Sequence, residues 1–214
     1  MTYPGNLVIW DVETGGFYPT QNLLTQIGLI AINPEGKELL RFQAYIKPYD
    51  KNLTLTKSAS DLTGITLEKL EREGRDLKEV LTEVASILKS LKVSYYMPTV
   101  VGHNVNFDMM FLEYVFNLCF AKNDKTDQCA LYNYIQKVPL DTIELARRKW
   151  RNNELGDFKL GTCAQYIGVE NRAAHDAMGD VEITVDLLKY LLSCLSGEGG
   201  HITQGKSDMN FQFK

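Results

Sequence analysis

In the stretch LVIWDVETGG, residues 7–16, an apolar segment leads directly into a pair of acids. Its first four residues are apolar, which predicts a strand inside a sheet. Asp11 and Glu13 follow at once, and side chains two residues apart on a strand share a face. Two carboxylates held that close repel one another, and their removal from water adds to the cost. The stretch therefore predicts a place where opposite charge compensates these acids.

The bulk composition is that of an ordinary globular chain. It has 214 residues, of which 44% are hydrophobic and 23% are charged, with a net charge of −4. This length predicts one domain with a small appendage, and the acidic balance argues against non-specific wrapping of long nucleic acid. The four cysteines contain no CxxC pair, which predicts reduced thiols. No apolar run long enough for a membrane span and no signal peptide is visible, so we expect a cytoplasmic protein without membrane contact.

The pattern along the chain predicts a strand-rich start followed by alternating strands and helices. Strands are expected at residues 6–11, 23–32, 39–47 and 98–104. Helical periodicity is expected at residues 76–91, 106–120, 159–169 and 176–195, and residues 138–150 read as a short strand that turns into a helix. This order is typical of the α/β class with a mixed sheet. The glycine-containing tail, residues 196–214, is expected to be flexible.

Two further acids stand out along the chain. Asp108 lies between Phe107 and Met109 on the most apolar helix, and a helix dipole offsets only about 0.3–1 kcal/mol of the cost of burying its charge. Asp180 stands near the start of the last helix, five residues after His175. Residues five apart on a continuous helix face in different directions. We therefore expect His175 in the loop or frayed turn ahead of that helix.

Acids in this arrangement suit hard divalent cations. Oxygen ligands favour Mg²⁺ or Mn²⁺, and two such ions about 3.5–4 Å apart are the usual arrangement for in-line displacement at phosphorus. A mobile imidazole can take the proton from the attacking water. Each acid alone has an ordinary explanation as a turn, cap or first-turn residue. Together with the histidine, they favour a nuclease site.

Three segments resemble the motifs of a known family. The segments DVETGG (11–16), GHNVNFDMMFL (102–112) and HDAMGD (175–180) are similar to the three motifs of the DEDDh, or DnaQ-like, 3′–5′ exonucleases, in the same order. That family includes the proofreading epsilon subunit of bacterial DNA polymerase III and ribonuclease T-like enzymes. The resemblance implies an α/β, ribonuclease H-like fold, with a central mixed five-stranded sheet flanked by helices. It implies an exonuclease domain over residues 1–195.

The resemblance also implies roles for individual residues. The metal-binding catalytic acids would be Asp11, Glu13, Asp108 and Asp180. His175 would be the general base. The terminal nucleotide would be held around Thr14, Gly15, Gly16, Phe17 and Asn104. Family members often read DxETTGL at the first motif, and this chain departs from it at Gly16 and Phe17, so the apolar wedge falls to Phe17 or Tyr18.

The implied activity is metal-dependent 3′–5′ hydrolysis of phosphodiester bonds at nucleic-acid 3′ ends, with two Mg²⁺ or Mn²⁺ ions and release of nucleoside 5′-monophosphates. Single-stranded DNA is the expected partner ahead of RNA, and a DNA polymerase or a sliding clamp is a further candidate partner. The tail segment KSDMNFQF (206–213) is the candidate contact to the clamp. The alternative is a non-catalytic module that keeps the fold and holds nucleic-acid ends or a protein. Such a module should lack an acid or the histidine, and all five are present.

Three other features have competing interpretations. His103 is expected to play a structural part, since His175 already fits the base. Asp141 fits a helix N-cap better than a ligand. The basic segment RRKW (147–150) is either a solvated helix end or a contact to a substrate phosphate.

Overall fold

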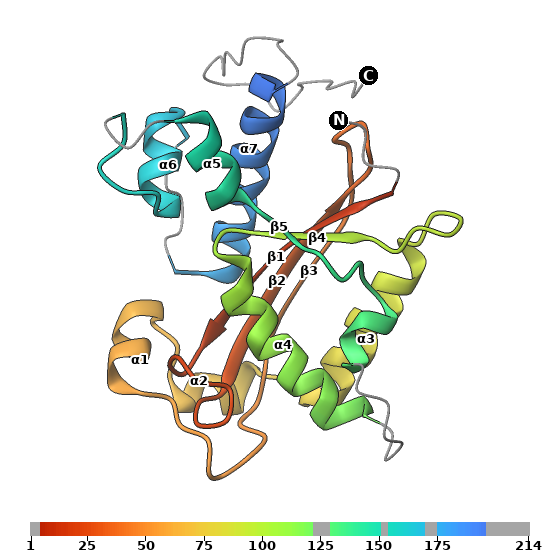
Figure 1. The fold of residues 1–214 in the computed structure, drawn as a ribbon. Coiled ribbons are helices and arrows are strands. Elements are labelled where there is room, and N and C mark those ends of the chain that lie inside the picture. Colours follow the sequence, from red (N-terminus) through yellow and green to blue (C-terminus); the bar gives the residue numbers. More distant parts are fainter. Residues whose placement is uncertain (1–4, 122–128, 151–153, 170–174, 196–214) are drawn as a thin grey trace.

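The computed structural model describes residues 5–121, 129–150, 154–169 and 175–195, which form a mixed five-stranded sheet covered by helices (Figure 1). The strands are β1 (Leu7–Thr14), β2 (Leu24–Ile32), β3 (Glu38–Tyr45), β4 (Thr99–Gly102) and β5 (Leu140–Asp141). Their order across the sheet is β3-β2-β1-β4-β5. The pairs β1–β2 and β2–β3 are antiparallel, and the pairs β1–β4 and β4–β5 are parallel. The α/β class and the five-stranded mixed sheet are confirmed.

Helices pack on both faces of this sheet. The helices of the described residues are α1 (Lys57–Thr63), α2 (Leu67–Glu73), α3 (Leu77–Ser90), α4 (Val105–Phe120), α5 (Thr142–Lys149), α6 (Leu160–Tyr166) and α7 (Ala177–Leu195), with a short 3₁₀ helix at Ala130–Asn133. Helices α3 and α4 share one hydrophobic cluster with one face of the sheet. Helices α5, α6 and α7 share a second cluster with the opposite face. The sheet is thus the middle layer of three.

Alternation along β1 decides which way its acids point. Val8 and Trp10 belong to the cluster on the α3–α4 face, whereas Leu7 and Ile9 belong to the cluster on the α7 face. Successive side chains of a strand point to opposite faces. The odd-numbered positions that follow, among them Asp11, therefore continue on the α7 face.

The expected strands and long helices are present, but two helices were missed. Helix α1 buries none of its seven residues, and its ends are formed by the Thr56 cap and by Gly64, whose φ of 68° is left-handed. Helix α2 buries only Leu70. Because neither helix presents a broad apolar stripe, hydrophobic periodicity gives no signal for them. Strand β1 is also longer than expected, since its pairing with β2 continues through the acids to Thr14.

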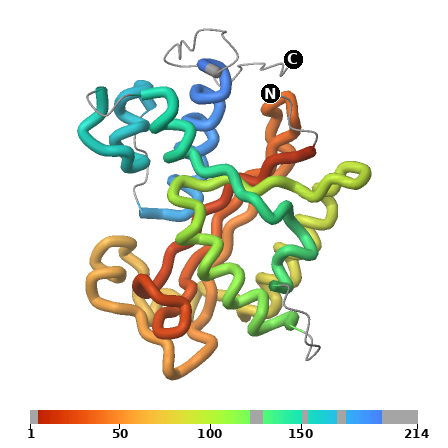
Figure 2. The backbone as a smooth tube through the Cα atoms, viewed as in Figure 1, coloured from red at the N-terminus to blue at the C-terminus, as the bar shows by residue number. Residues whose placement is uncertain are grey.

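The chain brings three distant segments together at one end of the sheet. Figure 2 shows the end of β1, the start of α4 and the start of α7 converging there. Within the described ranges, no helix combines the length and the apolar character that crossing a membrane requires. The four cysteines all lie in those ranges and form no disulfide. The expected tail, residues 196–214, lies outside the described residues.

Candidate active site

The sheet opens beside the acids of β1. Strand β1 pairs with β4 only from Leu7 to Ile9, after which β4 ends and the chain turns into α4. Asp108 lies in the first turn of α4 and is almost fully buried. Hydrogen bonding from the backbone of Val12 reaches its carboxylate. The ends of parallel strands form the place where α/β proteins usually bind ligands, and here that place holds carboxylates.

Helix α7 adds an acid to those of β1. Oxygen atoms of Asp11, Glu13 and Asp180 all lie within 4.8 Å of one another, which makes the three residues a candidate metal site. Gly28 of β2 pairs with Asp11 and lets α7 approach this closely. A Cβ atom at Gly28 would stand 2.9 Å from the carbonyl carbon of Ala177 at the start of α7. The position of Asp180 therefore depends on the missing side chain in β2.

Burial and mutual repulsion disfavour ionisation of the central acids. Burial raises the pKa of Asp11 well above its usual value, and the charges of Asp108, Asp180 and Glu13 raise it further. Burial also raises the pKa of Asp108, although backbone hydrogen bonds to its carboxylate oppose that shift. Each of these acids thus raises the free energy of the ionised site. Asp108 is electrostatically part of the group even though the three closest carboxylates do not include it.

The two remaining acids show the same effect. Burial, followed by the charges of Asp180 and Asp176, raises the pKa of Glu13 to about 7. Burial raises the pKa of Asp180 to about 6, while the neighbouring His175 lowers it. A divalent cation would reverse these shifts, because it stabilises the ionised form of every acid around it. The oxygen-only donor set therefore fits a hard metal ion.

Two glutamine side chains anchor the residues that precede α7. His175 is exposed and adopts a left-handed φ of 66° just ahead of the helix, which confirms its expected place. The next residue, Asp176, accepts a hydrogen bond from the backbone N–H of Gly179 at 3.3 Å. It also accepts from Nε2 of Gln26 at 2.8 Å and from Nε2 of Gln43 at 3.1 Å. Strands β2 and β3 thus anchor the segment that carries His175.

Sequence reasoning missed this anchor. Gln26 is only 1% exposed although it is polar, and it lies in a strand that is mostly apolar. Asp176 stands beside His175 in the third motif. A buried amide inside an apolar strand must find a hydrogen-bond partner, so Gln26 was a usable signal. Nothing in the sequence named Asp176 as that partner.

Asp141 secures the starts of two helices. Its carboxylate accepts from the backbone N–H of Ile143 at 2.9 Å, which confirms the expected N-cap of α5. It also accepts from the backbone N–H groups of Asn104 at 3.1 Å and Val105 at 3.2 Å. Asn104 is exposed and has a left-handed φ of 65°. One side chain therefore positions the beginning of α4, with Asn104 facing solvent.

His103 has the structural geometry that was expected. Its Nδ1 lies 2.9 Å from the hydroxyl of Thr142, and its Nε2 lies 2.8 Å from the carbonyl oxygen of Phe158. A carbonyl oxygen can only accept, so Nε2 carries a proton and donates. Burial lowers the pKa of His103, which favours the neutral ring. The imidazole thereby fastens the segment before α6 to the end of β4.

The turn after β1 uses several of its own polar groups. The hydroxyl of Thr14 donates to the carbonyl of Gly16 at 2.7 Å, and the backbone N–H of Gly15 donates to Leu23 at 2.7 Å. Phe17 is 74% exposed. These groups lie next to the acids along the chain, but two of the donors are already engaged within the turn. Their contact with a terminal nucleotide stays a prediction.

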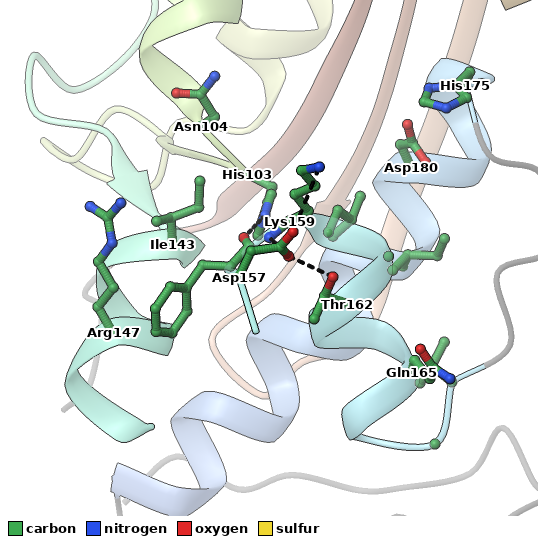
Figure 3. Close-up of a pocket in the computed structure, with 16 residues that line it drawn as sticks. His103, Asn104, Ile143, Arg147, Asp157, Lys159, Thr162, Gln165, His175 and Asp180 are labelled. Carbon is green, nitrogen blue, oxygen red and sulfur yellow. Dashed lines mark hydrogen bonds and ion pairs between the residues drawn. The ribbon is translucent and has the colours of Figure 1, made fainter. Parts of the chain in front are cut away.

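A large cavity extends from the acids along the helical layer. Its volume is about 1210 Å³, and it reaches from Asp180 and His175 to the residues of α5 and α6. Figure 3 shows His175 and Asp180 at one end of this cavity and Arg147 at the other. Asn104 lines it as well. The cavity therefore connects three of the predicted site residues with the surface of α5 and α6.

The sheet order and the acids at its open end define a ribonuclease H-like domain. A family model described as Exonuclease, of the RNase T type, matches residues 8–188. Since this match covers most of the chain, the chain belongs to that exonuclease family.

The chain is similar to one part of several longer proteins. It is 31% identical over 194 residues to DNA polymerase III PolC-type of Oceanobacillus iheyensis, covering 90% of this chain and 12% of that protein. The PolC-type polymerase of Bacillus subtilis is 26% identical over 193 residues, covering 90% and 12%. The chain thus spans only a small part of these relatives.

Solved structures of E. coli exonuclease I share the fold. The structure of that enzyme in complex with a dA16 oligonucleotide is 22% identical, with a TM-score of 0.73. The match covers 91% of this chain and 42% of the exonuclease I chain. At this level of identity the likeness establishes the fold.

Proposed function

We propose that this chain is a metal-dependent 3′–5′ exonuclease that hydrolyses the terminal phosphodiester bond of single-stranded DNA and releases nucleoside 5′-monophosphates. The observation that carries the proposal is the group of oxygens from Asp11, Glu13 and Asp180, within 4.8 Å of one another at the open end of β1. The match to the exonuclease family supports it. The proposal assigns residues 1–195 to the exonuclease domain.

The four acids would hold two divalent ions, Mg²⁺ or Mn²⁺. The three closest carboxylates supply oxygen ligands, and Asp108 adds its charge from the start of α4. When bound, the ions supply positive charge that stabilises the attacking and leaving oxygens of an in-line displacement. The raised pKa values of Glu13 and Asp180 support this role, because acids that resist ionisation gain most from a cation.

His175 would be the general base. Its side chain is exposed, and the residue precedes the first turn of α7, which holds Asp180. The imidazole accepts a proton from the water whose oxygen forms the new bond to phosphorus. The bond from phosphorus to the 3′-oxygen of the preceding nucleotide breaks, and that oxygen takes a proton from solvent. The Gln26–Asp176 hydrogen bond holds the backbone next to the base.

The comparisons support a DNA substrate and a polymerase partner. The relatives are PolC-type DNA polymerases, and the exonuclease I structure contains a DNA oligonucleotide. We propose single-stranded DNA as the substrate ahead of RNA, and association with a DNA polymerase. The proposed contact between residues 206–213 and a sliding clamp lies outside the described residues and stays a prediction.

A digestion assay tests this function. The purified chain is incubated with end-labelled single-stranded DNA, duplex DNA or RNA, with Mn²⁺ or with a chelator. We expect stepwise shortening of the DNA single strand from its 3′ end with Mn²⁺ only, and nucleoside 5′-monophosphates as the product. An Asp11→Ala variant should be inactive. Binding of Mn²⁺ and DNA without digestion would favour the non-catalytic module instead.

A further inference from the structure

The cavity beside the acids is larger than a terminal nucleotide requires. Its volume of about 1210 Å³ exceeds the roughly 300–1,000 Å³ of an ordinary small-molecule site. Away from His175 and Asp180, part of its lining is apolar and includes Ile143, Phe158 and Leu160. A single nucleotide at the acids would leave this part of the cavity unfilled.

Two cations line the same cavity, and each has only a weak partner. Arg147 Nη1 lies 3.0 Å from Glu144, and both side chains are more than half exposed. Lys159 Nζ lies 3.6 Å from Asp157, and the lysine is 83% exposed. Exposed ion pairs contribute little to stability. A phosphate group can therefore replace either carboxylate at small cost in free energy.

An aromatic ring, that of Phe158, lines the same cavity. The Phe158 carbonyl accepts from His103 Nε2, and Arg147 Cζ lies 5.8 Å from the centroid of the Phe158 ring. The hydrogen bond thus holds the backbone of Phe158, and Arg147 lies over its ring. Cations that follow a backbone, together with aromatic rings on which bases stack, are the usual means of binding a single strand.

The course of the DNA strand follows from what lies on either side of the acids. The turn after β1 lies next to α1, where the Gly15 carbonyl accepts from the Thr56 backbone N–H at 2.8 Å. Figure 1 shows α5 and α6 on the other side of the start of α7. If the terminal nucleotide lies at the turn, the preceding nucleotides leave toward α5 and α6.

We propose that the cavity between α5, α6 and the start of α7 binds the part of the DNA strand that precedes the scissile phosphate, with Arg147 contacting a backbone phosphate. This inference rests on the proposed function, because it requires the 3′ end to lie at the acids. Of the three consecutive basic residues of α5, Arg147 lines the cavity, whereas Arg148 and Lys149 do not. The RRKW segment was expected to be either a solvated helix end or a contact to a substrate phosphate. In this proposal each interpretation holds for part of it, since Arg147 contacts phosphate and its two basic neighbours are solvated.

Two substrates distinguish the contribution of this cavity from that of the acids. The p-nitrophenyl ester of thymidine 5′-monophosphate carries a scissile phosphate but no preceding nucleotide, whereas an oligothymidylate fills the cavity. We expect Arg147→Gln to raise the KM for the oligonucleotide about fivefold, the factor that roughly 1 kcal/mol produces. The slope of log KM against log salt concentration should fall by about 0.7, as for one lost phosphate contact on a single strand. Hydrolysis of the ester should be unchanged.

Arg148→Gln is the matched control, since it removes the same charge from the same helix outside the cavity. Its KM and salt slope should equal those of the parent chain, and Lys159→Gln should behave like Arg147→Gln in weaker form. An oligonucleotide KM that stays the same in Arg147→Gln, or rises equally in Arg148→Gln, contradicts the cavity proposal alone. If the parent chain hydrolyses neither the oligonucleotide nor the ester, the proposed function is contradicted, and the cavity proposal with it.

Discussion

The carboxylate of Asp11 is needed for the proposed hydrolysis but destabilises the metal-free fold. Burial and the charges of Asp108 and Asp180 raise its pKa, so its ionised form destabilises the metal-free fold. We expect Asp11→Asn to lower the rate of hydrolysis at least about 10²–10³-fold, as removal of one group that stabilises a transition state does. The same variant should unfold at a higher urea concentration than the metal-free parent, because a buried repulsion is removed.

Asp61→Asn provides the control for this pair of measurements. Asp61 lies on α1 with an exposed side chain, pairs with Lys57 and does not belong to the group of three carboxylates. Its replacement should leave both the rate and the urea midpoint close to those of the parent. A fully active Asp11→Asn protein, or one that unfolds at lower urea, would contradict the assignment of Asp11.

His175 should affect the chemical step without affecting the metal. It does not belong to the group of three carboxylates, so Mn²⁺ binding measured by calorimetry should be the same in His175→Gln and in the parent. Loss of a general base lowers the rate about 10²–10⁴-fold. If Mn²⁺ affinity falls together with the rate, His175 is a ligand and not the base.

At the scale of the element, the start of α7 depends on one cap. Asp176 caps Gly179 and accepts from Gln26, whose Oε1 accepts in turn from the backbone N–H of Ala177 at 3.2 Å. Asp176→Ala should lower the free energy of unfolding by about 1–3 kcal/mol, because it removes a cap and leaves a buried amide unpaired. It should lower kcat more than it raises KM. Asp176→Asn keeps an acceptor oxygen and should restore most of the stability; equal loss in both variants would show that hydrogen bonding is not the cause.

The close approach of α7 to β2 gives a second prediction for the same element. A Cβ at Gly28 would meet backbone atoms of Ala177, which cannot rotate away as a side chain can. Gly28→Ala should therefore lower the free energy of unfolding by about 1–3 kcal/mol and weaken Mn²⁺ binding, since Asp180 moves with the helix. Gly156→Ala is the control, because nothing lies within 4 Å of a Cβ there. Thermal unfolding and calorimetry would measure both, and unchanged Mn²⁺ affinity in Gly28→Ala would contradict the argument.

Elements with a wide apolar face were predictable, and elements held by caps were not. Helix α3 buries six side chains at helical spacing, and that spacing is visible in the sequence. Helix α1 buries none and depends on the Thr56 cap and on Gly64. Such caps also occur in isolated turns, so they do not by themselves predict a helix. The boundaries of β1 were missed for a related reason, since its acids resemble the end of a strand.

At the scale of the whole molecule, the acids could be located from the sequence, but their surroundings could not. Asp11 and Glu13 were singled out because two carboxylates so close are costly, and Asp180 because it follows His175 at the start of a helix; the fold brings the three together. The Gln26–Asp176 contact joins residues 150 positions apart. Likewise, the cavity that Arg147 lines forms only when α5, α6 and α7 are packed. Contacts of this kind leave no local pattern.

The convergence of these acids links folding, pH and metal binding. The pKa of Glu13 is raised to about 7 and that of Asp180 to about 6, so the folded chain binds protons more tightly than the unfolded chain does. The contribution of these two acids to the free energy of unfolding is therefore fully present below their ordinary pKa values. It is lost as the pH rises through about 6–7. A divalent ion that binds only the folded form should offset that loss.

Urea unfolding at pH 5 and pH 8, with a chelator or with Mn²⁺, measures this linkage. We expect the contribution of the acids to make the metal-free chain less stable at pH 8, and the gain from Mn²⁺ to be larger at pH 8 than at pH 5, because protons compete with the ion for the same oxygens. Glu13→Gln removes one of the titrating groups and should reduce both differences. If the parent and Glu13→Gln show the same pH dependence, the raised pKa of Glu13 is not a property of the folded chain. If Mn²⁺ stabilises both proteins equally at the two pH values, the ion binds somewhere other than at these acids.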